Sequence, residues 1–366
     1  MRIIERVCFC KEIMRNILLY SIAVSSLLCQ GVKAENYAIL VSAGKTYSDN
    51  NFQNTAYWTD LFLVYEYLLE TEHYDSTNVY VFYGDGVDYN SNLYRYDKTP
   101  HGWGSITDYD NSYNTMYNVL SSLNNVITEN DNLLFYWVSG HGGKNTSTND
   151  DSYFAYVENT QTYISKQNLV NLVNCIENYN KRKIIWMTCY SGCMGAGSVN
   201  LKNDKTVILT SCSKDAECYS FYDGYGEHHS EFNFALFSLS TGHHPLGSDC
   251  IVTASCPEFV PDCDTILSMH ELYTAISYFR YGNDITIYNL IQPCVFDQGS
   301  ISDRIFIGEQ HSLHDILFDD DSNYWLDDFA LSEVEIDGAN VFIEIDQECI
   351  LEKNILVNCG SQLKIK

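Results

Sequence analysis

Residues 131–143 read DNLLFYWVSGHGG, and residues 183–192 read KIIWMTCYSG. Each stretch opens with a continuous apolar run, which is typical of a strand buried on both faces of a parallel sheet. The first run leads directly into a turn that places His141 among glycines, and the second leads into Cys189 followed by Tyr-Ser-Gly. Because functional groups in open α/β sheets gather at the carboxyl ends of the strands, these two turns are predicted to meet.

Other parts of the chain continue the same pattern. Apolar runs predict further strands at residues 37–42, 78–83 and 206–210. Helical periodicity predicts helices at residues 55–70, 113–127, 165–179 and 269–281. This alternation implies an α/β fold with a mostly parallel sheet and helices on both faces.

Composition excludes several classes of protein. The chain has 366 residues, of which 45% are hydrophobic, so it can bury a substantial core and does not have the composition of a disordered chain. Its formal net charge of -27 would repel phosphate backbones and anionic membrane surfaces. Nucleic acid is therefore not expected as a partner.

The N-terminus has the pattern of an export signal. A short basic start, an apolar run at residues 17–28 and the small residue Ala34 predict a signal peptide over residues 1–34, with Met14 as an alternative true start. The run is shorter than the ~20 residues that a spanning helix needs, so no transmembrane segment is expected after cleavage. We expect a secreted protein, periplasmic or extracellular. A lipoprotein anchored through Cys29 is the alternative.

The cysteines carry a second expectation. Three of the 14 lie in the signal peptide, which leaves an odd number in the mature chain. In an oxidising compartment this number predicts one free thiol, taken to be Cys189, and as many as five disulfides, with Cys212–Cys218 and Cys349–Cys359 as candidate pairs. No cysteine spacing matches a zinc site, so neither a metal nor another cofactor is expected.

The chain is predicted to have two parts after the signal peptide. Residues 35–308 carry the strand and helix alternation. Residues 309–366 begin with a stretch crowded with aspartate and glutamate and then alternate like short strands, so we expect an acidic linker and a small β-rich appendage. The acidic stretch lacks the glycine and closing glutamate of a calcium-binding loop.

Cys189 and His141 form a candidate nucleophile and base. A thiol is a nucleophile as its thiolate, and a neighbouring imidazole raises the thiolate fraction. Glycines beside both residues leave room for a substrate backbone and for main-chain N–H groups that face an oxyanion. Taken alone, His141 could be an ordinary surface histidine, and Cys189 could be a core cysteine or half of a disulfide. Their positions at successive strand ends favour catalysis.

These motifs resemble those of the caspase-fold cysteine peptidases, and most of all the legumain family. The resemblance spans about residues 36–308 and includes the segment LTSCSKDAECY at residues 209–219. It implies a thiol endopeptidase that acts on proteins or peptides. Cys189 would be the nucleophile and His141 the general base, with the N–H groups of Gly142 and Cys189 as oxyanion donors.

The sequence departs from the family at the pocket for the substrate side chain. Tyr190 stands where legumains carry glutamate, and the loop at residues 49–54 lacks their arginine, so specificity for asparagine does not transfer. The family's stabilising residue before the first helix is left open among Ser42, Lys45 and Thr46.

Acidic residues dominate the segments that would form this pocket. We expect Glu217 and Glu231 as the main recognition residues, with Tyr190 and the remaining acids around them, Asp215, Asp223 and Glu227. Carboxylates favour a cationic side chain, so cleavage after Arg or Lys is predicted, with Asn as the alternative. Two other functions stay open: a transpeptidase that uses the same thioester, and an inactive binding scaffold.

Overall fold

The computed structural model describes part of the chain, chiefly residues 34–45, 56–89, 94–222, 228–241 and 293–296. It also describes helical residues 269, 272, 273 and 276 and five short strands between residues 323 and 365. Residues 1–33, with nearly all of the predicted signal peptide, lie outside the described residues. Among the helices that are described, none has both the length and the apolar character needed to cross a membrane.

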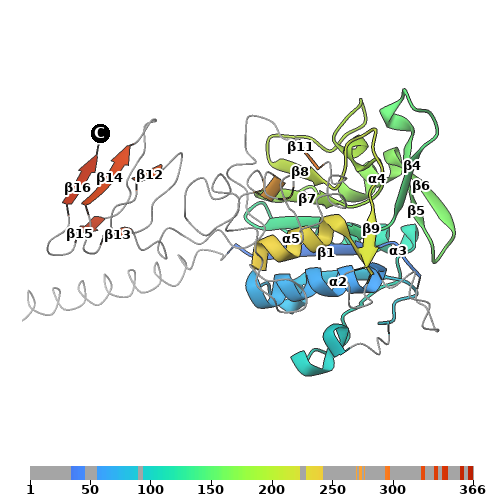
Figure 1. Ribbon diagram of the computed structural model, residues 1–366, viewed down its shortest axis with the longest axis horizontal. Helices are drawn as coiled ribbons and strands as arrows, with labels where there is room; N and C mark the ends of the chain where they lie inside the picture. The colour runs from blue at the N-terminus through green and yellow to red at the C-terminus, as the bar shows by residue number, and fades with distance from the viewer. Residues whose placement is uncertain are drawn as a thin grey trace, which may run out of the picture. The chain divides into compact units, whose positions relative to one another are not determined.

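The central element is a six-stranded sheet (Figure 1). Its strands run in the spatial order β11-β8-β7-β3-β1-β2, and all neighbours pair in parallel except β11 with β8. The predicted mostly parallel α/β fold is therefore confirmed. The bounds are β1 (Asn36–Ser42), β2 (Val79–Tyr83), β3 (Asn132–Ser139), β7 (Arg182–Trp186), β8 (Thr206–Thr210) and β11 (Cys294–Phe296).

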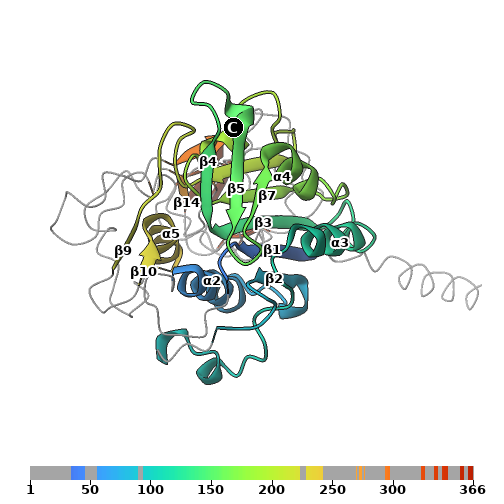
Figure 2. The same ribbon diagram turned by 90° about the vertical axis from the view of Figure 1, so that its right-hand side faces the viewer.

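Helices cover both faces of this sheet (Figure 2). The side-chain period of two along each strand divides the core: Leu134 and Tyr136 of β3 pack with α2 and α5, whereas Phe135 and Trp137 pack with α3 and α4. Both faces are therefore apolar, which explains the continuous apolar runs in the sequence. The helices are α2 (Ala56–Glu66), α3 (Tyr113–Leu123), α4 (Lys166–Val173) and α5 (Glu231–Thr241).

Short helical turns punctuate the connections. Helix α2 continues into a π-helical turn at Tyr67–Thr71, and 3-10 turns lie at Ser76–Asn78, Tyr94–Tyr96, Thr99–His101, Asp150–Ser152 and Ser191–Met194. Helices α3 and α4 begin at N-cap serines, Ser112 and Ser165, whose hydroxyls accept from backbone N–H groups of the first turn.

Helix α5 is locked to α2 by a buried polar network. The Asp60 carboxylate lies 3.1 Å from Nδ1 of His229 and accepts from the backbone N–H of Ser230 and the side chain of Asn233. Tyr96 contacts the other nitrogen of His229 at 2.8 Å. Because every charged or polar member has partners, this cluster positions the elements rather than offering a reactive group.

His141 lies in a strand, and the prediction of a turn at this residue is wrong. Residue 141 opens β4 (His141–Lys144), which pairs antiparallel with β5 (Tyr153–Val157), and β5 pairs with β6 (Thr162–Ser165). We call these three strands the hairpin sheet. The glycines of β4 gave no strand signal because strand glycines are normally disfavoured.

The described residues contain three smaller sheets besides these, one before α5 and two near the C-terminus. A short antiparallel pair, β9 (Ser220–Tyr222) and β10 (His228–Ser230), precedes α5. Near the C-terminus, β12, β14 and β16 form one parallel sheet, and β13 and β15 form another. The strands predicted near the C-terminus are confirmed, and the domain boundaries stay predictions. Bounds are β12 (Asn323–Trp325), β13 (Val334–Ile336), β14 (Asn340–Glu344), β15 (Ile355–Val357) and β16 (Gln362–Ile365).

Candidate active site

The turn that carries Cys189 is tightly constrained. It follows β7, and Tyr190 adopts a left-handed backbone conformation with φ of 57°. The backbone N–H of Tyr190 donates to the carbonyl of Ala216 at 2.8 Å. A Cβ atom on Gly192 would lie 2.4 Å from the backbone nitrogen of Lys214, so only glycine fits there. Non-glycine residues in this conformation cost free energy and are concentrated at functional sites.

The hairpin sheet is fastened to the same turn. The hydroxyl of Tyr153 in β5 lies 2.7 Å from Oγ1 of Thr188 and accepts from Nε1 of Trp186 at 2.9 Å. A Cβ atom on Gly142 would lie 2.4 Å from the carbonyl oxygen of Cys189, so the two backbones touch. The predicted meeting of the histidine and cysteine segments is therefore seen at the level of the backbone.

His141 presents an exposed ring held by a carboxylate. Its side chain is 67% exposed, and its Nε2 lies 3.4 Å from Oε1 of Glu158. The ring of Tyr57 meets the imidazole edge-on at 6.4 Å. The hydrogen bond to Glu158 and the negative charge of Glu158 raise the pKa of His141 above its ordinary value, against a smaller opposing effect of burial.

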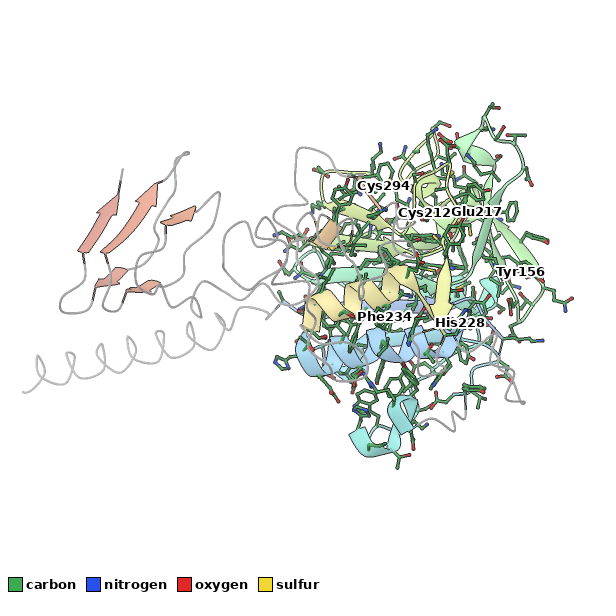
Figure 3. The ribbon with its side chains drawn as sticks, in the orientation of Figure 1. Tyr156, Cys212, Glu217, His228, Phe234 and Cys294 are labelled. Atoms are coloured by element: carbon green, nitrogen blue, oxygen red, sulfur yellow. The ribbon has the colours of Figure 1, made fainter. Side chains whose placement is uncertain are left out.

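Glu158 is a candidate functional residue that was not predicted from the sequence. It follows β5, and its backbone N–H donates to the carbonyl of Ala43 at the end of β1. Its carboxylate accepts from the Tyr57 hydroxyl at 2.7 Å. Tyr156, the residue opposite His141 in the ladder, and Glu217 lie toward the same end of the molecule (Figure 3). Residues 153–157 read YFAYV, a run rich in aromatic residues that indicates a strand, and the acid directly after this run was the available signal.

The thiol of Cys189 is activated. Its pKa is lowered to about 6, first by a hydrogen bond from the Cys218 thiol and then by the backbone N–H of Cys218, which donates to Sγ at 3.3 Å. The positive charge of His141 acts in the same direction, while burial and Glu217 oppose it. Since the pKa of His141 is raised, a thiolate and an imidazolium coexist at pH values just above 6.

The disulfide prediction is wrong for the described cysteines. Six cysteines in this part of the chain are free thiols: Cys175, Cys189, Cys193, Cys212, Cys218 and Cys294. Sγ of Cys218 lies 3.0 Å from Sγ of Cys212 and 2.9 Å from the carbonyl oxygen of Thr188, and its single S–H proton serves one acceptor at a time. Cysteine number alone could not show that Cys218 is a free thiol beside two others. Cys349 and Cys359 lie outside the described residues.

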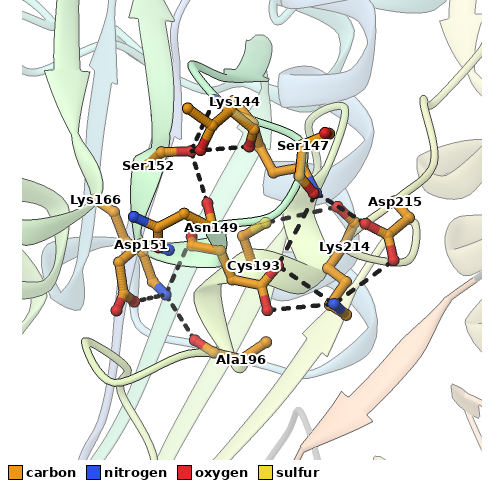
Figure 4. A network of polar contacts seen from close by, with 12 residues as sticks. Lys144, Ser147, Asn149, Asp151, Ser152, Lys166, Cys193, Ala196, Lys214 and Asp215 are labelled. Carbon is orange, nitrogen blue, oxygen red and sulfur yellow. Dashed lines mark hydrogen bonds and ion pairs between the residues drawn. The ribbon is translucent and has the colours of Figure 1, made fainter.

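The predicted pocket residues differ in their surroundings. Glu217 is exposed and accepts from the hydroxyl of Tyr190 at 3.1 Å, which places both beside the nucleophile. Asp215 is exposed but pairs with Lys144 at 2.8 Å and with Lys214 at 3.6 Å (Figure 4). Its charge is therefore compensated, which disfavours Asp215 as a site for a cationic side chain.

Glu231 lies at the start of α5 and is 4% exposed. Its backbone N–H donates to the carbonyl of Tyr219, the neighbour of Cys218. Burial raises the pKa of its carboxyl to about 7, so it is partly protonated near neutral pH. The other two acids proposed for the pocket, Asp223 and Glu227, lie outside the described residues.

The candidates for the family's stabilising residue also differ in their surroundings. Ser42 is fully buried, and its hydroxyl donates to the carbonyl of Tyr57 at 2.9 Å, so it holds the start of α2 against β1. Lys45 is exposed, and its carbonyl accepts from the hydroxyl of Tyr83. Thr46 lies outside the described residues.

Two other features lie apart from this site. Glu66, Glu70 and His101 could together offer metal ligands, but Arg95 donates to both carboxylate oxygens of Glu66 at 3.0 and 2.5 Å and already compensates its charge. A groove of about 870 Å³ runs along α3 and α4 and is lined mainly by asparagine and tyrosine. It contains neither Cys189 nor His141.

Comparisons with known proteins leave the family open. No protein-family model matches the chain, and no curated protein matches it. Among solved structures, the crystal structure of caspase-1 from Spodoptera frugiperda is 13% identical, with a TM-score of 0.38, and the match covers 72% of this chain and 87% of that one. A similarity this distant establishes neither a shared activity nor a shared fold family, so function has to come from the site.

Proposed function

We propose that the protein is a caspase-fold cysteine endopeptidase in which Cys189 is the nucleophile and His141 the acid and base. The observation that carries this proposal is the backbone contact between Gly142 and Cys189. It brings an activated thiol and an imidazole oriented by a carboxylate to the same edge of a parallel sheet, which is where such enzymes build their sites.

The first half of the reaction uses the charged pair. The Cys189 thiolate attacks the carbonyl carbon of a peptide bond, and the oxyanion is held by the N–H groups of Gly142 and Cys189. The His141 imidazolium then gives its proton to the leaving amine, so a thioester forms and the first product departs. Glu158 keeps the proton on His141 until that step, because its hydrogen bond and its negative charge raise the pKa of the imidazole.

The second half restores the enzyme. Neutral His141 takes a proton from water, the hydroxide attacks the thioester, and the carboxylic acid product leaves as the thiolate and imidazolium reform. An amine in place of water would give a transpeptidase.

We infer that the substrate residue before the cleaved bond is Arg or Lys, with Asn as the alternative. Glu217 supports this inference, since it is an exposed acid bound to Tyr190, the residue after the nucleophile. A fluorogenic panel with Arg, Lys, Asn and Asp before the scissile bond tests it. Glu217→Gln should reduce the preference for Arg over Asn ~2- to 5-fold, as for an exposed charge, while Asp215→Asn should change it less. A preference for Asp would contradict the acidic pocket.

Export to the periplasm or the extracellular space is proposed on the pattern of residues 1–34. N-terminal sequencing of the mature protein tests it: a first residue at Glu35 supports export, and a retained N-terminus overturns it.

Covalent labelling decides between the proposed function and its alternatives. A chloromethyl ketone peptide ending in Arg should modify Cys189, as found by peptide mapping, and Cys189→Ala should lose all activity. Product analysis with an added amine separates hydrolysis from transfer. If Cys189 is not labelled and no peptide is cleaved, the protein is a binding scaffold and the proposal fails.

A further inference from the structure

Three thiols lie in a row at the candidate active site. Cys218 occupies the middle: its backbone N–H donates to Sγ of Cys189 at 3.3 Å, and its own Sγ lies 3.0 Å from Sγ of Cys212. The hydroxyl of Ser211 lies 2.8 Å from the Cys218 sulfur. Peptide hydrolysis uses Cys189 as the nucleophile and Cys218 as its hydrogen-bond partner, but it requires neither the Cys212 thiol nor any sulfur chemistry at Cys218.

The three thiols differ in reactivity. Cys189 and Cys218 are both partly exposed, but Cys189 has the lowered pKa and a larger thiolate fraction, so an oxidant reacts with it first. Cys212 is completely buried, and its hydrogen bond from Cys218 lowers its pKa. Burial raises the pKa of the Cys218 thiol, which stays protonated between them. An order of reaction from Cys189 through Cys218 to Cys212 follows from these positions.

We propose that Cys218 is a resolving cysteine that rescues oxidised Cys189, and that Cys212 then takes over the disulfide and releases the nucleophile. The site would react with hydroperoxides as a class. This proposal concerns regulation of the proposed active site and so rests on the proposed function. The disulfides and sulfinic acids can nevertheless be measured in a protein without peptidase activity.

Each step balances. The Cys189 thiolate attacks one oxygen of the hydroperoxide and breaks the O–O bond, which leaves a sulfenic acid on Cys189. The departing alkoxide or hydroxide takes a proton from the His141 imidazolium and leaves as an alcohol or water. The Cys218 sulfur attacks the Cys189 sulfur, and the sulfenic hydroxyl leaves with the Cys218 proton as water. The Cys212 thiolate then attacks the Cys218 sulfur, forms the Cys212–Cys218 disulfide and expels Cys189 as a thiolate. One hydroperoxide thus consumes two thiols and leaves the nucleophile intact.

The test treats the reduced full-length protein with one equivalent of hydrogen peroxide at neutral pH. Free thiols are blocked at timed intervals, and disulfides and sulfinic acids are mapped by mass spectrometry. We expect a Cys189–Cys218 disulfide first and a Cys212–Cys218 disulfide later. Reactivity of Cys189 toward iodoacetamide should fall and then return without added reductant. Direct oxidation of Cys189 to the sulfinic acid, with neither disulfide formed, would overturn the proposal.

Variants separate the two supporting thiols. In Cys212→Ser, Cys189 should remain bound to Cys218 until dithiothreitol is added. In Cys218→Ser and Cys218→Ala, oxidised Cys189 should pass to the sulfinic acid, which dithiothreitol does not reverse. Cys193→Ser is the matched control, because Cys193 is also buried but bonds to the carbonyl of Lys214 instead, and it should behave as wild type. Equal recovery of Cys189 in the Cys218 variants and wild type, compared at equal extents of oxidation, would exclude a resolving role.

The labelling results also keep the two proposals apart. Formation of the disulfides in a protein that cleaves no peptide would contradict the proposed function and leave the thiol sequence standing. Peptidase activity with no disulfide at Cys218 would support the proposed function and contradict the resolving role of Cys218.

Discussion

The cysteine turn and the hairpin sheet hold their reactive groups in different ways. Cys189 is half-buried in a turn with a left-handed residue, a glycine that tolerates no side chain and several backbone hydrogen bonds. His141 stands on a short strand with an exposed ring, and one carboxylate, Glu158, orients it. Packing therefore fixes the position of the nucleophile, whereas the pKa of the base is raised mainly by the hydrogen bond and charge of Glu158, with a smaller contribution from the charge of Cys189.

Removing the base should have the largest effect among changes to the hairpin sheet. His141→Ala deletes both the charge that helps to form the thiolate and the proton donor for the leaving amine. We expect kcat/KM to fall ~10²- to 10⁴-fold, with an unchanged melting temperature because the ring is exposed. Steady-state kinetics and thermal unfolding measure both. A loss below 10-fold would mean that another group serves as the base.

The second-largest loss of activity is expected when an added methyl group pushes the hairpin sheet away from the cysteine turn. Gly142→Ala would place a Cβ atom 2.4 Å from the carbonyl oxygen of Cys189, so the hairpin sheet has to shift. A displacement of about 1 Å costs roughly 10²-fold in rate.

Gly104→Ala supplies the matched control, because an added Cβ atom there meets nothing within 4 Å. Its kcat/KM should equal that of the wild type. Similar rates in the two alanine variants would show that the contact between the hairpin sheet and the cysteine turn does not matter for catalysis.

A smaller and more specific effect is expected from Glu158→Gln, which keeps the shape of the side chain and removes its charge. Glu158 raises the pKa of His141, so in the variant the imidazolium loses its proton at a lower pH. The alkaline limb of the pH–rate profile should move to lower pH, while the acid limb, set by Cys189, stays near pH 6. We expect ~10-fold lower activity at pH 8 and less loss at pH 6. An alkaline limb that does not move would remove Glu158 from the mechanism.

Sequence patterns predicted the parallel sheet because strands such as 206–210 are buried on both faces and therefore read as unbroken apolar runs. The same patterns predicted that Cys189 and His141 would share an edge. Helix α5 was not predicted because its polar and apolar residues are mixed round the helix without an amphipathic period, although most of the helix is buried.

The rest of the site depends on contacts that no local pattern records. Glu158 lies beside His141 because β4 pairs with β5 and Glu158 directly follows β5. Cys218 lies beside Cys189 although it belongs to the segment after β8, whereas Cys189 follows β7. The sequence predicted Asp215 as a recognition residue, but Lys144 and Lys214 compensate its charge in the structure. Such pairings are set by tertiary structure.

The most direct test of the central claim is the pH dependence of Cys189 alkylation. Iodoacetamide reacts with the thiolate, so the rate at Cys189, followed by peptide mapping, reports its ionisation. The structure predicts a half-maximal rate at about pH 6, and a move to higher pH in His141→Ala because the imidazolium lowers the thiol pKa. A midpoint near the ordinary value of ~8.5, unchanged in His141→Ala, would contradict the assignment of Cys189 and His141 as a catalytic pair.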